Sequence, residues 1–197
     1  MCAAAIKDLV LSLYMIDLDD LAIYETLDPT CLRQRLNTMS EQCRQAWLVA
    51  ERTVVHGAPD QCTEIIVAGM GGSAIAGDLV SDLSRAVSSI PVRVVRDFRI
   101  PALLAGSNLG AGQLVIICSF SGETKETLSM FDNARSAGVP IVVITGGGTL
   151  GHRAIEAGVP VITIDSSGEP RSAVGYNLML LTSLLARFGA IKITDLE

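Results

Sequence analysis

The chain has 197 residues and a formal net charge of −6, and 49% of its residues are hydrophobic but only 4% aromatic. This length suits one domain with a substantial core, and so apolar a composition excludes a disordered chain. An acidic chain without a cluster of Lys and Arg is not a general nucleic-acid binder. Because no apolar stretch is long enough to cross a bilayer, we expect a cytoplasmic protein without membrane partners.

The N-terminal part of the chain predicts two helices. Apolar residues recur at mixed helical spacing over 6–24, and an Asp-Pro-Thr sequence at 28–30 then interrupts the pattern. Residues 31 to about 56 predict a longer helix with one apolar stripe, which ends at the His-Gly-Ala-Pro sequence of 56–59. We therefore expect an N-terminal helix or arm over 1–30 and a single domain over 31–197.

The rest of the chain alternates between predicted strands and helices. Strands are expected over 64–68, 92–96, 114–118, 141–145 and 161–164, and helices over 73–87, 124–137, 149–157 and 171–188. Only residues 100–112 separate the second and third strands, with room for a short helical turn. Continuous β-branched runs between helices predict an α/β fold, a three-layer αβα sandwich around a five-stranded parallel sheet of the doubly wound, flavodoxin-like type.

The five cysteines are scattered along the chain, at positions 2, 31, 43, 62 and 118. Their number is odd and no pair has metal-site spacing, so we expect free thiols and no metal site. Cys118 closes the third predicted strand, where we expect a buried structural residue and not a reactive one.

Two loops rich in Gly and Ser each follow a predicted buried strand and open a helix. They are Gly-Met-Gly-Gly-Ser at 69–73 and Ser-Phe-Ser-Gly-Glu-Thr at 119–124. Such a loop directs free backbone N–H groups and the positive end of a helix dipole at whatever lies above it. The hydroxyls of the two loops add further short donors. Two such loops on neighbouring strands predict a cup for a phosphate-bearing ligand.

These loops also fit two other interpretations. Residues 69–74 fit the minimal dinucleotide pattern G-x-G-x-x-A, and Asp97 follows the next predicted strand as a ribose-binding acid would. A nicotinamide enzyme does not need the second loop, so we expect no cofactor. A plain helix cap by Ser121 or Thr124 explains one hydroxyl of that loop but not all of them.

Three segments resemble the sugar isomerase (SIS) domain, in the form found in the bifunctional phosphoglucose/phosphomannose isomerase family. They are Met-Gly-Gly-Ser-Ala at 70–74 followed by Gly77 and Asp78, the segment 119–127, and Pro-Arg-Ser-Ala-Val-Gly-Tyr at 170–176. The resemblance covers roughly residues 31–188 and corresponds to the N-terminal half of that family.

The resemblance implies a role for each matching position. Four hydroxyl side chains would hold the phosphate of a hexose 6-phosphate, namely Ser73, Ser119, Ser121 and Thr124. Gly71 and Gly72 would let the backbone approach the sugar. Arg171 would stabilise charge on an enediolate-like intermediate, a task suited to a fixed guanidinium, although a surface ion pair is the alternative for an Arg at a helix start.

The catalytic acid and base are not accounted for. Aldose–ketose isomerisation needs a base to move a proton between C1 and C2 and an acid to open the ring. In the family these groups are a Glu, a His and a Lys of a second SIS domain, beyond the match to this chain. Neither His56 nor His152 matches a family position, which leaves Glu169 as a candidate base or as a plain solvent-exposed carboxylate.

Three functions stay open at this point. The chain is the phosphosugar-binding SIS domain of a phosphoglucose/phosphomannose isomerase-like protein, a stand-alone isomerase with one SIS domain, or a non-catalytic sensor of sugar phosphates. The expected partner in each case is a small sugar phosphate. We also expect a homodimer, because SIS domains usually associate and the apolar N-terminal helices need cover.

Overall fold

The computed structural model describes residues 17, 19–55, 62–88, 90–101, 112–166 and 168–192. Its centre is one sheet whose five strands are all parallel. Across the sheet the strands lie in the order β2 (Val92–Val95), β1 (Glu64–Gly69), β3 (Gln113–Ser119), β4 (Ile141–Thr145) and β5 (Val161–Thr163). The five predicted strands are thus confirmed, each within one residue of its expected ends.

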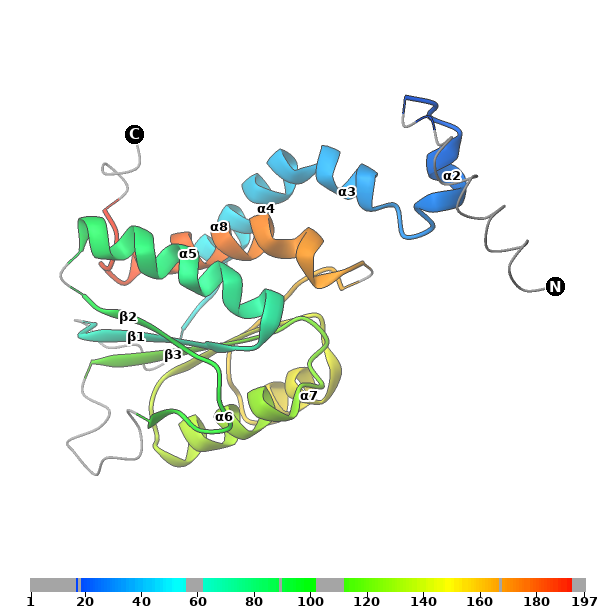
Figure 1. Cartoon of the computed structure of the whole chain (residues 1–197). Helices are drawn as coiled ribbons and strands as arrows, with labels where there is room; N and C mark the ends of the chain where they lie inside the picture. The colour runs from blue at the N-terminus through cyan, green and yellow to red at the C-terminus, as the bar shows by residue number, and fades with distance from the viewer. Residues whose placement is uncertain are drawn as a thin grey trace, which may run out of the picture.

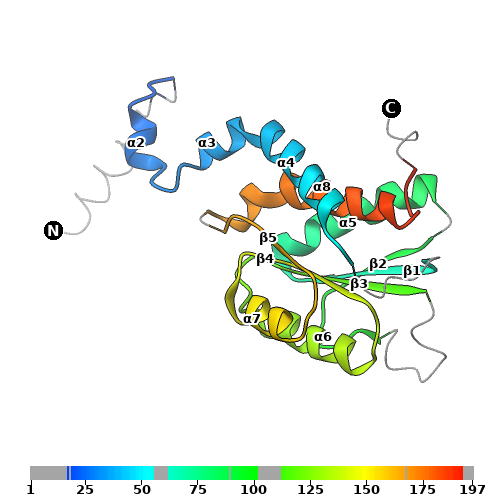
Figure 2. The same ribbon diagram turned by 180° about the vertical axis from the view of Figure 1, so that it is seen from behind.

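Helices cover both faces of this sheet, as Figures 1 and 2 show from opposite sides. One layer holds α4 (Met39–Arg52), α5 (Gly71–Val87) and α8 (Val174–Arg187), and the other holds α6 (Lys125–Ser136) and α7 (Gly148–Glu156). Successive residues of a strand point to opposite faces, so β1 contributes to both cores. Ile65 packs into the core of the first layer and Ile66 into that of the second. The predicted three-layer αβα sandwich is confirmed.

The strand order creates a switch point between β1 and β3. From β1 the chain moves outward to β2, then crosses back to β3 on the other side of β1. Gly69 at the end of β1 is in register with Cys118, next to the end of β3. The loops that follow these strands therefore start side by side at the carboxyl edge, which is where ligands bind in open α/β sheets.

The prediction of a single helix over 31–56 is wrong. The structure contains α3 (Leu32–Asn37) and α4, separated at Thr38. The Thr38 hydroxyl donates to the carbonyl oxygens of Gln34 at 3.2 Å and Arg35 at 3.1 Å, and such bonds from a side chain to its own helix bend or interrupt it. Position 56, the expected helix end, lies outside the described residues.

Of the arm expected over 1–30, the structure describes residue 17 and residues 19–30. It contributes the short helix α2 (Ile23–Leu27), which projects with α3 away from the sheet (Figure 1). Asp28 joins these two helices, because its carboxylate accepts bonds from the amides of Leu32 and Arg33, both at 2.8 Å. These amides, Arg33 first, lower the pKa of Asp28.

The remaining elements differ little from expectation. The last predicted helix begins as a 3₁₀ turn, η2 (Pro170–Ala173), and continues as α8. The helical turn expected within 100–112 falls mostly outside the described residues. Within the part of the chain that the structure describes, no helix has the length and apolar character needed to span a bilayer.

Candidate functional site

The loop after β1 leaves the first amides of α5 without a side-chain cap. Met70 occupies the cap position and forms no capping bond. Gly71 adopts a positive φ of 49°, a conformation that few residues other than glycine reach easily. The first N–H groups of a helix lack the usual partner one turn earlier. The Ser73 amide donates to the Met70 carbonyl at 3.1 Å, which leaves the amides of Gly71 and Gly72 open to a ligand.

The loop after β3 is folded around its own hydroxyls. The amide of Gly122 donates to Ser119 Oγ at 3.1 Å, and the amide of Glu123 donates to Ser121 Oγ at 3.2 Å. Thr124 occupies the cap position of α6 but makes no capping bond through its side chain. The Ser119 hydroxyl donates its own proton to Thr124 Oγ1 at 3.4 Å. A hydroxyl that accepts a bond still has its own proton to donate, so Ser121 and Thr124 remain donors toward an anion.

The two loops are joined to each other directly. The amide of Phe120 donates to Ser73 Oγ at 3.1 Å, which links the second loop to the first turn of α5. A pocket of about 270 Å³ lies over this junction, and its lining residues are Met70, Gly71, Gly72, Ser73, Phe120, Ser121, Thr124 and Pro170. Five of the seven predicted binding residues therefore line one pocket. Ser119 is 3% exposed and lies 3.4 Å from the Thr124 hydroxyl, at the base of the loop.

Gly122 holds the second loop against the neighbouring one. Its φ is +71°, and a Cβ added there would lie 1.9 Å from the carbonyl oxygen of Gly147. Both the backbone conformation and the lack of room for a Cβ atom therefore require glycine at this position.

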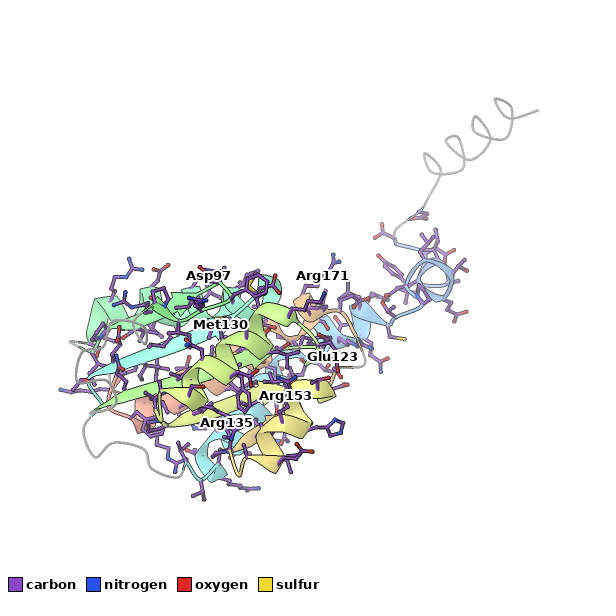
Figure 3. All side chains as sticks on the ribbon, turned by 90° about the horizontal axis from the view of Figure 1, so that it is seen from below. Asp97, Glu123, Met130, Arg135, Arg153 and Arg171 are labelled. Carbon is purple, nitrogen blue, oxygen red and sulfur yellow. The ribbon has the colours of Figure 1, made fainter. Side chains whose placement is uncertain are left out.

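Arg171, the seventh predicted binding residue, lies in η2 beside the pocket but does not line it. Its neighbour Pro170 contributes to the lining, and Figure 3 shows Arg171 and Glu123 toward the end of the molecule from which the N-terminal helices project. Arg171 is exposed and forms no salt bridge within the described residues. The surface ion pair considered from the sequence is therefore not what holds this side chain.

Glu169 precedes η2, and its surroundings favour the ionised form. The Thr30 hydroxyl is the largest cause that lowers the pKa of Glu169, followed by the backbone amide of Glu169 itself and then by the charges of Arg35 and Arg171. A carboxylate stabilised in this way is a weaker base than an unperturbed one.

The other groups singled out from the sequence lie away from the pocket lining. Burial raises the pKa of the Cys118 thiol to about 12, and only 2% of the residue is exposed, which fits the structural role expected for it. Asp97 accepts a bond from the amide of Phe98 at 2.6 Å. His152 is exposed on α7, and His56 lies outside the described residues.

Sequence reasoning missed the contact between Glu123 and the start of α7. The amide of Thr149 donates to Glu123 Oε1 at 2.7 Å, and its hydroxyl donates to Oε2 at 2.9 Å. The two residues are 26 positions apart, and no spacing rule links them. The glycines at 146–148, which follow a strand at the same edge, are the sequence feature that could have drawn attention to this region.

One domain family and several known proteins match this chain. Residues 60–150 match the family model of the SIS domain. The chain is 36% identical over 157 residues to the bifunctional phosphoglucose/phosphomannose isomerase of Caldicellulosiruptor bescii, a match that covers 80% of the chain and 45% of that enzyme. It is 39% identical over 125 residues to the enzyme of the same name from Thermoplasma acidophilum, covering 64% of the chain and 36% of that enzyme. The chain thus spans less than half the length of these relatives.

Solved structures share the fold. The structure of a candidate phosphosugar isomerase from Clostridium difficile 630 matches with a TM-score of 0.62 and 19% identity, over 83% of this chain and 48% of that one. The NanR protein of Vibrio vulnificus, solved in complex with ManNAc-6P, matches with a TM-score of 0.53 and 20% identity, over 88% of this chain and 69% of that one. The resemblance inferred from the sequence motifs is confirmed.

Proposed function

We propose that this chain, whose residues 60–150 form a SIS domain, binds a hexose 6-phosphate in the pocket between its two Gly/Ser loops. The chain would be the phosphosugar-binding part of a phosphoglucose/phosphomannose isomerase-like protein, which interconverts the aldose 6-phosphates of glucose and mannose with the ketose fructose 6-phosphate. Both named relatives are bifunctional phosphoglucose/phosphomannose isomerases, which supports this choice of substrate.

The single observation that carries the proposal is the bond between the Phe120 amide and Ser73 Oγ, 3.1 Å long. It brings the uncapped N-termini of α5 and α6 to one pocket. Each N-terminus offers free amides and the positive end of a helix dipole, and the two together suit a dianionic phosphate. No charged side chain of the described residues lines this pocket. The backbone amides and the hydroxyls would therefore provide the specificity for phosphate.

In this proposal the phosphate anchors the sugar and the reacting carbons extend toward η2. Arg171, one residue beyond the pocket lining, would stabilise the negative charge that develops on an enediolate-like intermediate. Glu169 stays the candidate base of this chain, with its lowered pKa counting against it. The phosphate-binding groups and Arg171 would act together with an acid and a base held elsewhere in the assembled enzyme.

A second copy of the chain is the proposed protein partner. Leu27 on α2 and Leu36 on α3 are 55% and 48% exposed on helices that project from the domain. Covering such leucines in a homodimer would remove apolar surface from water.

Calorimetric titration with fructose 6-phosphate, with fructose as the matched control, tests the proposed function. We expect saturable binding of the phosphorylated sugar and at least a hundredfold weaker binding of fructose, since hydrogen bonds to a charged group contribute about 1.5–3 kcal/mol each. Equal affinity for both sugars, or no binding by a folded sample, would contradict the proposal. A coupled isomerase assay on the same sample shows whether turnover accompanies binding.

A further inference from the structure

Glu123 lies in the second loop between two of the proposed phosphate ligands, yet it is not among the residues that line the pocket. Its carboxylate instead contacts Thr149 with both oxygens, at 2.7 Å from the amide and 2.9 Å from the hydroxyl. The charged side chain of the loop is therefore directed to another element, and the proposed phosphate function does not account for it.

The acceptor that Glu123 supplies is one that α7 lacks. Gly147 stands at the cap position of α7 and has no side chain, and Thr149 is the second residue of the helix, so its amide has no partner within the helix. A carboxylate at this end also interacts favourably with the helix dipole. The Thr149 amide and hydroxyl, followed by the charge of His152, lower the pKa of Glu123, so the carboxylate is ionised near neutral pH.

Backbone contacts run in parallel with this side-chain contact. The Gly146 amide donates to the Phe120 carbonyl at 3.1 Å, and the Leu150 amide donates to the Gly122 carbonyl at 2.9 Å. A Cβ on Gly148 would lie 2.5 Å from the Ser121 carbonyl oxygen and 2.6 Å from Glu123 Oε1, so the two loops touch closely. The loop that holds Ser121 and Thr124 is thus fixed to the start of α7 on one side and to Ser73 on the other.

We propose that Glu123 is a positioning residue of the phosphate pocket, which holds the loop of residues 119–124 against the N-terminus of α7 and so orients the Ser121 and Thr124 hydroxyls toward the ligand. This role rests on the proposed function for its ligand, fructose 6-phosphate. The same contact explains why the N-terminus of α7, at the same sheet edge, does not bind the phosphate: its second amide is already occupied by a carboxylate.

Electrostatics alone and positioning predict opposite results for Glu123→Ala. Removing a negative charge near a phosphate site strengthens anion binding if only the field matters. Removing a positioning contact weakens anion binding. We expect the Kd for fructose 6-phosphate to rise roughly tenfold, which is the scale of one hydrogen bond to a charged group. Glu123→Gln keeps an acceptor for the Thr149 amide and is expected within about threefold of the original affinity.

The matched control is Glu126→Ala, which removes the same charge from the first turn of α6. It is expected to leave the affinity unchanged or slightly tighter. A ligand-free readout is hydrogen exchange at the amides of residues 122 and 123, which bond to Ser119 and Ser121. These amides should exchange about tenfold faster in Glu123→Ala and at the original rate in the other two variants.

Equal or tighter sugar-phosphate binding by Glu123→Ala would overturn the proposal, and so would unchanged exchange at the two loop amides. Absence of binding by the original chain, together with faster exchange in Glu123→Ala, would reject the proposed ligand and leave the loop-positioning role standing. The two proposals therefore fail in distinguishable ways.

Discussion

Replacing Ser119, Ser121 and Thr124 together by alanine is expected to weaken fructose 6-phosphate binding by at least about a hundredfold, as measured by calorimetric titration. The three hydroxyls belong to one loop, and two of them line the pocket. Ser121 and Thr124 would donate to phosphate oxygens, and a hydrogen bond to a charged group contributes about 1.5–3 kcal/mol. Ser119 is buried beneath them and donates to Thr124 Oγ1, so it would support the Thr124 hydroxyl. Because the three side chains act on one ligand, their losses of binding free energy need not add. The expected loss of affinity is therefore smaller than the sum of three such bonds would give.

Loss of binding in this triple variant must be separated from loss of the loop itself. Ser119 is buried and accepts a bond from the Gly122 amide, so its removal also affects the fold of the loop. Ser121→Ala alone removes one exposed acceptor, that of the Glu123 amide, and is the variant that keeps the core intact. We expect Ser121→Ala to retain the thermal stability of the original chain and to weaken binding by about tenfold. Undiminished affinity in the triple variant would show that the phosphate is bound elsewhere.

Gly122→Ala is expected to lower the free energy of unfolding by about 3–5 kcal/mol. An alanine at φ +71° carries a conformational cost of about 1–2 kcal/mol, and its Cβ would overlap the Gly147 carbonyl oxygen, 1.9 Å away. Relief of this overlap would separate the loops after β3 and β4, and we expect sugar-phosphate binding to be lost with it. Urea unfolding followed by circular dichroism measures the stability change.

Gly138→Ala is the matched control for that change. Gly138 also has a positive φ, +68°, but an added Cβ there would meet no atom within 4 Å. Its cost is therefore the backbone conformation alone, about 1–2 kcal/mol, with no effect on binding. Similar costs for the two substitutions would mean that the close approach of Gly122 to Gly147 is not what requires glycine in the loop.

The elements with strong local signals could be predicted from the sequence. Continuous β-branched runs such as 141–145 predicted buried parallel strands, because only a strand covered on both faces is apolar throughout. The two Gly/Ser loops could be assigned to one pocket because the carboxyl ends of parallel strands meet at one edge.

Features that depend on which partner a side chain finds could not be predicted in this way. The division between α3 and α4 depends on which acceptor the Thr38 hydroxyl finds, and a periodic apolar stripe continues through it unchanged. The pairing of Glu123 with Thr149 depends on how two loops from different strands approach each other. Glu123 directly precedes the cap residue of α6, yet its carboxylate binds the N-terminus of α7.

Mapping of backbone amides by two-dimensional NMR during titration with fructose 6-phosphate tests the central claim most directly, because it reports where the ligand binds and not only that it does. We expect the largest shift changes at the amides of Gly71, Gly72 and Ser73 at the start of α5 and of residues 121–124 before α6. Fructose without phosphate should leave these amides unchanged. Saturable shift changes confined to other parts of the chain, with these amides unaffected, would show that the phosphate does not bind between the two loops.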